Sequence, residues 1–429
     1  MTQKICVIGL GYVGLTLSLA LAEKKIKVYG YDSNSKVIDS LASGKSHIFE
    51  KDINKYLKKH LNKNFFVTNE LSDKFRTFII TVGTPVIHNK KSNSHNSDLS
   101  HIVKITKKLA KIIKKNTLLI YRSTLPVGTT RNKILPIFTR NQLQTSKDYF
   151  LSYAPERTVE GNAINELRTI PQIIAGIDEA SLRKTKNIFK KLSKEIVEVQ
   201  NVETAEIIKL INNTYRDLSF AYSNQIALIC QKYKISAKET INFSNYNYPR
   251  NKIPTPSPGV GGPCLSKDPY ILNEVLSSKK ESIFTVGRNI NEKIVDVLAK
   301  NIVANLGATK RKKILISGIS FKGYPLTKDH RGSAIFRFYK ILDKLKYFSV
   351  YVDDPLFSKQ EVLNFNFKYR DEKIKYDCIV FLNNNPLIKK ESTRLIRKNL
   401  NKSGLIFDFW SVIDDEKIKK KYKYFEIGN

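Results

Sequence analysis

The sequence predicts an α/β protein in which a helical domain with a long central helix joins two Rossmann-like, doubly wound domains. Short β-type runs alternate with helical patterns over about the first 120 residues, and the same alternation resumes near residue 310. Between these regions lies one long helical pattern without Pro or Gly. A chain of 429 residues is long enough for two or three domains. We therefore expect domains at residues 1–200, 201–308 and 309–429.

The first domain shows strand and helix patterns in close succession. Strand-type runs are expected at 4–10, 27–32, 75–82 and 117–123, and helices at about 12–24, 34–42 and 99–115. Alternation of this kind predicts a parallel sheet with helices on both faces. Because ligands of such sheets bind beyond the carboxyl ends of the strands, the loops that follow these strands are the expected binding site.

The middle of the chain is helical. The long pattern runs from Val202 to about Lys232 and would be roughly 45 Å long at 1.5 Å per residue. A helix of this length can bridge two domains or pack against a second subunit. A shorter helical pattern and a loop rich in Pro and Gly follow it. Strand-type runs then return at 312–321, 348–354, 376–382 and 404–410, which predicts the second sheet.

The cysteines of the chain are few and scattered. Four cysteines show no spacing typical of a zinc site or a disulfide framework, so no metal is expected. Cys6 and Cys378 lie in strand-type runs and Cys230 lies in a helical pattern, and we expect these three to be buried. Only Cys264 stands in a loop. With 41% hydrophobic residues, the chain can bury a sizeable core around them.

The chain is strongly basic. It has 74 Lys and Arg against 39 Asp and Glu, a net charge of +35. Such a charge suits nucleic acid, an acidic membrane surface or a phosphorylated substrate. Because the lysines are spread along the whole chain and no nucleic-acid-binding module occurs, we favour a solvated basic surface without specific nucleic-acid binding. With neither a signal-peptide profile nor an apolar run near the roughly 18 residues of a membrane span, the sequence favours a cytoplasmic protein without membrane attachment.

The segment GLGYVGL links the first strand-type run to the first helical pattern. Its GxGxxG glycines permit a tight turn and let the backbone approach a pyrophosphate at the helix N-terminus. Asp32, at the end of the next strand-type run, can bind a ribose 2′-hydroxyl and so favours NAD over NADP. A purely structural glycine turn is the alternative. The residues of this segment expected to contact the cofactor are Gly9, Gly11, Tyr12, Val13 and Gly14.

Three further segments carry candidate site residues. TVGTPV (81–86) and RSTLPVG (122–128) follow strands, so Thr84 and Thr124 are candidates for contact with cofactor or substrate, although each loop is also typical of an ordinary turn. APERTVEGNAINELR brings two acids and two arginines together, which indicates either a site or a salt-bridge cluster at a helix start. The four residues concerned are Glu156, Arg157, Glu160 and Arg168.

Two features of the central region could carry chemistry. Lys209 and Asn213 are four residues apart and would face the same side of the long helix, where they either stabilise an oxyanion or simply lie exposed. The segment SPGVGGPCLSKDP (257–269) has three glycines and three prolines, so Cys264 cannot lie in a regular helix or central strand. A lysine beside Cys264 would lower the pKa of its thiol and favour a nucleophilic role.

Taken together and in order, these motifs resemble the nucleotide-sugar 6-dehydrogenase family, whose members oxidise UDP-glucose, UDP-N-acetylglucosamine or UDP-N-acetylmannosamine to uronates. The resemblance spans nearly the whole chain. It rests on seven segments: GLGYVGL, TVGTP, STLPVG, PERTVEG, AEIIKLINNTY, GVGGPCLSKDP and GISFKG…DHRGS. It implies NAD as cofactor, a UDP-sugar as substrate and a homodimer through the central helix.

The resemblance implies a role for each candidate catalytic residue. Cys264 would add to the intermediate aldehyde as a thiohemiacetal, which a second hydride transfer converts to a thioester. Lys209 and Asn213 would steady the oxyanion, and Asp268 would assist proton transfer. The residues that would help position the water that cleaves the thioester are Glu156 and Thr124, with Glu160 near the same site.

The same resemblance implies the residues that hold the ligands. Gly261 and Gly262 would present bare backbone to the sugar, and Arg250 would reach the sugar, in one arrangement across a dimer. Lys322 and Arg331 would hold the UDP. The remaining residues that we expect to line the site are Arg157 and Phe321, which would contact the substrate, and Lys267, which would contact the cofactor. Arg331 would contact the cofactor as well as the UDP.

The leading hypothesis is an NAD-dependent UDP-sugar 6-dehydrogenase that serves surface polysaccharide synthesis. The segment YPR (248–250) and the wide spacing between Lys322 and Arg331 favour a UDP-N-acetylhexosamine, whereas Lys267 is also usual among UDP-glucose enzymes. UDP-glucose is therefore the alternative substrate. Two less favoured hypotheses are a two-electron dehydrogenase of the β-hydroxyacid type, which would not need Cys264, and a basic nucleic-acid-binding protein.

Overall fold

The computed structural model describes residues 4–89, 94–276, 282–307 and 311–428. The chain divides into two compact units. Unit 1 contains Met1–Asn212 and Tyr270–Lys279, and unit 2 contains Asn213–Pro269 and Lys280–Asn429. Helix α8 (Val202–Tyr233) and helix α10 (Asp268–Glu274) each pass from one unit into the other.

Unit 1 is built on an eight-stranded sheet with the order β10-β9-β8-β7-β4-β1-β2-β3. Neighbouring strands are parallel except for β8 and β9. The chain order reverses on the two sides of β1, so the loops after β1 and β4 flank a topological switch point, where open α/β sheets bind ligands. The strands are β1 (Lys4–Ile8), β2 (Lys27–Tyr31), β3 (Phe65–Thr68), β4 (Thr77–Ile80), β7 (Thr117–Tyr121), β8 (Tyr149–Tyr153), β9 (Gln172–Gly176) and β10 (Ile196–Glu198).

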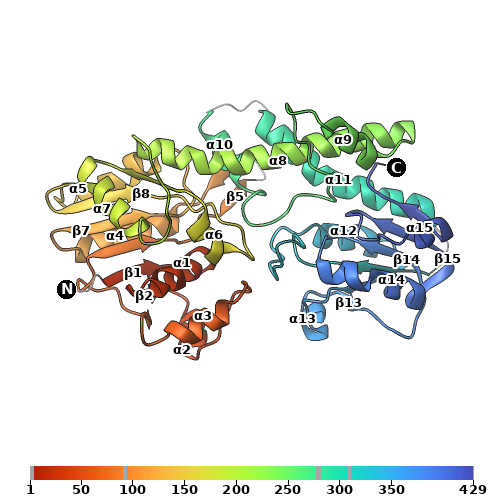
Figure 1. The fold of residues 1–429 in the computed structure, drawn as a ribbon, viewed down its shortest axis with the longest axis horizontal. Coiled ribbons are helices and arrows are strands. Elements are labelled where there is room, and N and C mark those ends of the chain that lie inside the picture. Colours follow the sequence, from red (N-terminus) through yellow and green to blue (C-terminus); the bar gives the residue numbers. More distant parts are fainter. Residues whose placement is uncertain (1–3, 90–93, 277–281, 308–310, 429) are drawn as a thin grey trace. The chain divides into compact units, whose positions relative to one another are not determined.

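Alternate residues of β1 face two separate cores, one on each side of the sheet. Figure 1 shows this sheet with the helices that cover it. Ile5 and Val7 pack with the first group of helices, whereas Cys6 and Ile8 pack with the second. The first group consists of α1 (Tyr12–Glu23), α2 (Ser35–Ala42), α3 (Ile53–His60), α6 (Ala163–Thr169) and α7 (Glu179–Phe189). The second consists of α4 (Ser100–Ile112), the π-helix η1 (Thr130–Ile134), α5 (Leu135–Thr139) and the start of α8.

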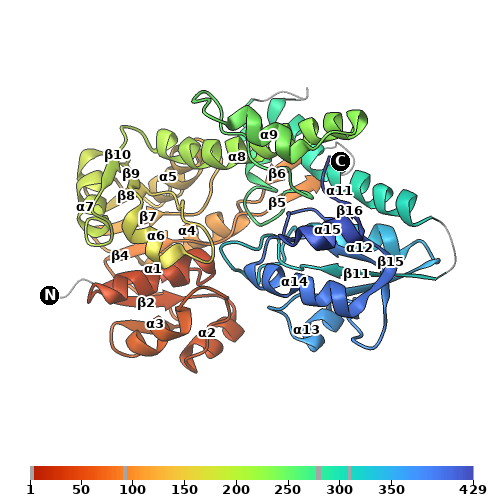
Figure 2. The same cartoon turned by 45° about the vertical axis from the view of Figure 1, so that its right-hand side comes forward.

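Unit 2 is built on a six-stranded parallel sheet with the order β13-β12-β11-β14-β15-β16. Figure 2 shows this sheet among the teal and blue elements. One face packs on α11 (Ile283–Leu306), α12 (Ala334–Asp343) and α13 (Lys359–Asn364), and the other on α14 (Pro386–Asn399) and α15 (Glu416–Lys421). The strands are β11 (Lys312–Ser317), β12 (Phe348–Asp353), β13 (Lys368–Tyr369), β14 (Tyr376–Phe381), β15 (Leu400–Asp408) and β16 (Lys423–Phe425). Helix α9 (Ala237–Asn245) follows α8.

The predicted fold class is confirmed, and the predicted strands and helices occur within a few residues of their expected ends. The long helix ends at Tyr233, one residue beyond the expected end. Cys6, Cys230 and Cys378 are buried as expected, and Cys264 lies in a turn. The antiparallel pair of β5 (Val86–Asn89) and β6 (Ser94–Ser97) has no counterpart in the predicted pattern, since β6 is wholly polar and neither strand shows the alternation that predicts a half-buried strand.

Each sheet has the same pair of hydrogen bonds just after its first strand, which we call the backbone lock. In unit 1, Gly9 N–H donates to Tyr31 and Leu10 N–H donates to the Asp32 carboxylate at 2.8 Å. In unit 2, the corresponding bonds run from Gly318 to Asp353 and from Ile319 to Asp354. Each lock ties the turn after the first strand to the end of the neighbouring strand.

Candidate active site

The glycines of the first loop shape the start of helix α1. Gly9 has φ of +91°, in the region that favours glycine. A Cβ at Gly14 would lie 1.8 Å from the Gly9 carbonyl oxygen, so only glycine lets the helix pack this closely on the turn. A Cβ at Gly11 would meet nothing within 4 Å. The first and third glycines are therefore required by the fold, and the second leaves open space beside the helix N-terminus, as a bound pyrophosphate requires.

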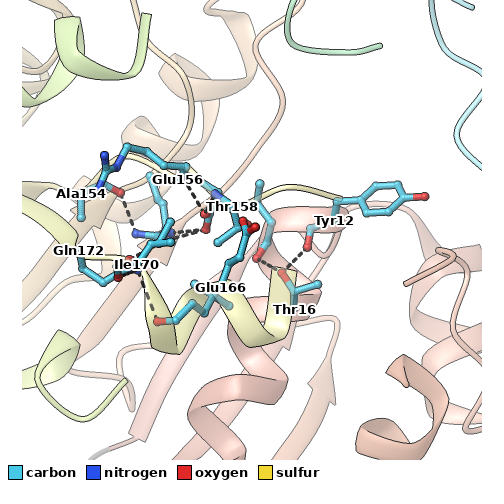
Figure 3. Close-up of polar contacts among 12 residues, drawn as sticks. Tyr12, Thr16, Ala154, Glu156, Thr158, Glu166, Ile170 and Gln172 are labelled. Carbon is cyan, nitrogen blue, oxygen red and sulfur yellow. Dashed lines mark hydrogen bonds and ion pairs between the residues drawn. The ribbon is translucent and has the colours of Figure 1, made fainter. Parts of the chain in front are cut away.

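Asp32 lies at the end of β2, beside this loop. Its Oδ2 accepts from Leu10 N–H at 2.8 Å and its Oδ1 accepts from Asn34 N–H at 2.9 Å. Each carboxylate oxygen keeps a second acceptor position, so the group can still bind ribose hydroxyls. Tyr12 and Val13 open helix α1, where their carbonyls accept from the Thr16 hydroxyl at 2.6 and 3.3 Å (Figure 3).

The loops after β4 and β7 are tied together. The Thr84 hydroxyl donates to the Thr124 carbonyl at 2.6 Å, and the Thr81 hydroxyl donates to the Gly9 carbonyl at 2.6 Å. The Tyr153 hydroxyl, at the end of β8, donates to the Ser123 carbonyl at 2.9 Å. The structure therefore ties the loops of Thr84 and Thr124 to each other and, through Thr81, to the glycine loop, and their contact with a ligand stays a prediction.

Glu156 lies buried in the loop after β8, and its partner is Arg122. Arg122 Nε and Nη2 donate to Glu156 Oε2 at 3.0 and 2.7 Å, while the backbone N–H groups of Arg157 and Thr158 donate to Oε1, both at 2.7 Å. Arg122 also donates to the Ala154 carbonyl and the Gln172 side chain (Figure 3). All four acceptor positions of the carboxylate are thus used.

For Glu156, this arrangement corrects the interpretation of the segment as a salt-bridge cluster at a helix start. Residues 154–160 are not helical, since α6 begins only at Ala163, and Glu156 pairs with Arg122 instead of an arginine of its own segment. Burial raises the pKa of the Glu156 carboxyl, but Arg122, the Thr158 N–H and Lys209 together outweigh burial and lower it. Glu160 is half-buried in the same loop.

Helix α8 carries a row of buried polar residues. Lys209 and Asn213 are both buried, and Asn213 Nδ2 donates to Asp268 Oδ2 at 2.6 Å. Glu206 and Asp217 continue the row in both directions at spacings of three and four residues. The sequence prediction included the two middle members and missed the outer two, although the same helical spacing would have found them. The simple exposed alternative for Lys209 and Asn213 is wrong.

Glu206 binds the segment after β7. Its carboxylate accepts from Gly128 N–H at 2.6 Å, Thr130 N–H at 2.9 Å and the Thr130 hydroxyl at 2.6 Å. Burial raises its pKa to about 7, although the bonds from Thr130 and Gly128 act in the opposite direction.

Cys264 lies half-buried in a turn directly before α10. Its carbonyl accepts from the N–H groups of Lys267 at 3.1 Å and Asp268 at 2.9 Å, so the first turn of α10 holds the cysteine. Lys267 Nζ lies 2.7 Å from Asp268 Oδ1. Arg288, which the sequence analysis missed, donates to the Leu265 carbonyl.

Arg288 fastens this loop from helix α11. Its guanidinium is buried and also donates to the Val260 carbonyl at 2.8 Å, and it pairs with Asp217 of α8. Burial raises the pKa of Asp217 to about 6, against the effect of Arg288. The cysteine loop is thus pinned at two carbonyls by one buried cation.

Gly261 and Gly262 are explained by contacts within unit 2. A Cβ at Gly261 would lie 2.1 Å from the Gly332 carbonyl oxygen, and a Cβ at Gly262 would lie 2.7 Å from the Phe321 ring. Gly262 N–H also donates to the Arg331 carbonyl at 3.0 Å. Protein atoms therefore require both glycines, and contact with a sugar stays a prediction.

The remaining predicted ligand residues lie at more open positions. The ammonium of Lys322 lies 5.6 Å from the Phe321 ring centre, and Arg331 pairs with Asp329. Arg250 is exposed, with its guanidinium 5.4 Å from the Tyr248 ring centre. Phe321, Lys322 and Arg331 therefore lie in the unit that carries the cysteine loop, whereas the cofactor loop lies in unit 1.

A glycine turn at the switch point of a parallel sheet, with an acid at the end of the next strand, defines a dinucleotide-binding protein. Comparison with protein families shows to which family of dinucleotide-binding proteins the chain belongs. The chain belongs to the UDP-glucose/GDP-mannose dehydrogenase family: residues 3–193 match its NAD binding domain and residues 203–293 match its central domain. The predicted cofactor, NAD, and the predicted family resemblance are confirmed.

Similar proteins cover most of the chain. The UDP-N-acetyl-D-mannosamine dehydrogenase of Pyrococcus horikoshii is 33% identical over 79% of this chain and 81% of its own. That of Methanococcus maripaludis is 29% identical over 100% of this chain and 97% of its own. A solved structure of the Staphylococcus aureus UDP-N-acetyl-mannosamine dehydrogenase is 27% identical, with a TM-score of 0.85 over 100% of this chain and 98% of that chain.

Within the part of the chain that the structure describes, no helix has the length and apolarity needed to span a bilayer.

Proposed function

We propose that this protein oxidises the C6 hydroxymethyl group of a UDP-N-acetylhexosamine, with UDP-N-acetylmannosamine as the first candidate, to the uronic acid. The observation that carries the proposal is Cys264, held in a pinned turn in a chain whose relatives are named UDP-N-acetyl-D-mannosamine dehydrogenases. One alcohol, two NAD⁺ and one water give one carboxylate, two NADH and three protons. The product would supply surface polysaccharide synthesis.

The chemistry divides into two oxidations and one hydrolysis. NAD, when bound, accepts the hydride in each oxidation. Loss of a hydride from C6 and of the hydroxyl proton gives an aldehyde, and the Cys264 thiolate adds to it with uptake of a proton to form a thiohemiacetal. Loss of the second hydride and of the thiohemiacetal hydroxyl proton gives a thioester. Water then attacks C6, a C–O bond forms, the C–S bond breaks and the Cys264 thiolate is released.

The proposed roles of the other residues follow from their chemistry. Lys209 supplies a buried cation to the oxyanion and Asn213 an amide, which its bond to Asp268 orients. Asp268 assists proton transfer. Glu156 and Thr124 help position the hydrolytic water, with Glu160 near the same site. Because all four acceptor positions of Glu156 are filled, Glu156 would act on the water only indirectly, through the loop that it fixes and through its negative charge, and would accept neither a hydrogen bond nor a proton from it.

Each unit would hold its own ligand with its predicted residues. In unit 1 we assign NAD to the glycine loop, Asp32 and Thr84, and in unit 2 we assign the UDP to Lys322. The remaining assignments to substrate or cofactor are Arg157, Arg250, Gly261, Gly262, Lys267, Phe321 and Arg331. We assign residues 1–200 to NAD binding, 201–308 to the helical middle and 309–429 to UDP binding.

We also propose a cytoplasmic homodimer formed through helix α8. Tyr215, Tyr222, Ile229 and Tyr233 recur at seven, seven and four residues along one side of the helix, and their exposed fractions are 68%, 57%, 48% and 69%. An exposed aromatic stripe of this kind is typical of a protein interface. Sedimentation velocity should show a dimer that Tyr222→Glu dissociates. A monomeric wild-type protein would contradict the proposal.

A spectrophotometric assay of NADH formation with a panel of UDP-sugars tests the proposed function. We expect the highest kcat/KM with a UDP-N-acetylhexosamine and two NADH per sugar consumed. A clear preference for UDP-glucose would reverse the choice of substrate. One NADH per sugar with release of an aldehyde or ketone would favour the two-electron alternative.

A further inference from the structure

Glu206 is a fully buried carboxylate to which the proposed reaction gives no role. Three donors converge on it: Gly128 N–H at 2.6 Å, Thr130 N–H at 2.9 Å and the Thr130 hydroxyl at 2.6 Å. All three donors are neutral. Burying an ionised carboxylate among neutral groups is costly, so a polar but uncharged side chain would serve stability alone at lower cost.

The contacts of Glu206 join two elements that carry proposed catalytic residues. Glu206 lies one turn before Lys209 on the same side of α8, and the charge of Lys209 in turn lowers the pKa of Glu156. The loop that Glu206 binds contains Thr124, whose carbonyl accepts from the Thr84 hydroxyl. The helix end of the loop is therefore fixed by Glu206 and its strand end by Thr84.

A second link joins the same two elements at the surface. Glu203, one turn before Glu206, pairs with Arg131 of η1 at 2.7 Å, and the two side chains are 29% and 45% exposed. An exposed pair of this kind contributes little to stability. Glu203 therefore offers a matched control, because it is an acid of the same helix that binds the same segment but lies at the surface.

We infer that Glu206 is a positioning residue: its ionised carboxylate holds the loop after β7 against α8 and thereby fixes Thr124 relative to Lys209. The inference rests on the proposed function, because it takes Lys209 and Thr124 as members of the reacting site. It assigns to Glu206 no contact with substrate.

The protonation of Glu206 supplies a distinct signature. Burial raises its pKa to about 7, with Glu203 on its own helix acting in the same direction and the donors Thr130 and Gly128 in the opposite one. Arg131 on η1 also faces it. When the carboxyl group is protonated, the proton can take its fourth acceptor position, and the three hydrogen bonds lose the negative charge that strengthens them. The loop is thus held most strongly above about pH 7.

The experiment compares Glu206→Gln with Glu203→Gln in the full chain. At pH 8, kcat of Glu206→Gln should fall on the order of 10- to 100-fold, the usual effect of misplaced reacting groups, with the KM for NAD changed less than about threefold. Glu203→Gln should stay within about twofold of wild type. The ratio of wild-type to Glu206→Gln kcat should be several-fold smaller at pH 6 than at pH 8, because the residue at this position titrates only in the wild type.

Equal effects of the two variants, or a ratio that does not change with pH, would overturn the inference. Thr130→Val removes one donor, leaves both N–H bonds and should lower kcat less than Glu206→Gln, which keeps the test open if the latter folds poorly. Amide hydrogen exchange at Gly128 and Thr130 should accelerate in Glu206→Gln and not in Glu203→Gln. This readout needs no substrate, so a wild-type protein that oxidises no UDP-sugar would contradict the proposed function alone.

Discussion

Replacing Arg122 with Met would leave the buried Glu156 carboxylate without its cation. The Arg122 side chain is fully buried and that of Glu156 is 8% exposed, and two hydrogen bonds of 3.0 and 2.7 Å join them. Removing one partner of a buried ion pair costs about 3–5 kcal/mol, because the remaining charge is uncompensated. We expect Arg122→Met to lower the free energy of unfolding by this amount at pH 8.

The cost should depend on pH with a definite sign. In the wild type the pKa of Glu156 is lowered, so its ionised form contributes stability that is present above the ordinary pKa of 4.5 and is lost as pH falls through the native value. Without Arg122, burial should raise this pKa, and the variant then loses stability as pH rises. The gap between the two proteins should therefore widen from pH 5 to pH 8.

Thermal unfolding followed by circular dichroism measures this gap. At about 2–4 °C per kcal/mol for a unit of this size, Arg122→Met should unfold roughly 6–20 °C below wild type at pH 8. Arg131→Met, which breaks the exposed pair with Glu203, should shift Tm by no more than about 4 °C. The double variant Arg122→Met/Glu156→Gln should recover part of the loss. A Tm within about 2 °C of wild type at pH 8 would refute the reasoning.

Three further predictions concern the cofactor loop and the cysteine. Wild type should strongly prefer NAD, and Asp32→Ala should raise the relative kcat/KM for NADP; equal use of both cofactors by wild type would contradict the role of Asp32. Gly11→Ala should keep its Tm but bind NAD more weakly in a titration, whereas Gly14→Ala should fail to fold, because its Cβ would lie 1.8 Å from a carbonyl oxygen. Cys264→Ala should keep its fold and lose uronate formation. Cys264→Ser should give at most a slow first turnover, with a covalent adduct visible by intact-protein mass. If Cys264→Ala still forms two NADH per sugar at the wild-type rate, Cys264 is not the nucleophile.

Local sequence patterns predicted most of the fold and the positions of the key loops. The alternation around GLGYVGL predicted β1, α1 and β2 because periodicity and turn chemistry are local properties. The four-residue spacing of Lys209 and Asn213 likewise predicted a shared helix side. These features depend on neighbours within a few residues along the chain.

The partners of the buried charges could not be predicted in this way. Arg122 and Glu156 are 34 residues apart, and Arg288 and Asp217 are 71 apart, so only the folded sheet and helices bring them together. Gly261 shows the same limit, since the carbonyl that excludes a side chain there belongs to Gly332. In each case the sequence shows which residue is present, but the residue that it contacts in the fold is distant in sequence.

The repeated backbone lock separates folding from cofactor recognition. In unit 2 the lock is intact, with Gly318 and Asp354 in the positions of Gly9 and Asp32, but Ser320 stands where the open glycine, Gly11, stands in unit 1. An aspartate after the second strand therefore has a structural role in the fold that does not depend on binding ribose. A designer who wishes to change the cofactor should keep an acceptor for the Leu10 N–H, for which asparagine is the closest in shape, and alter the neighbours of Asp32 first.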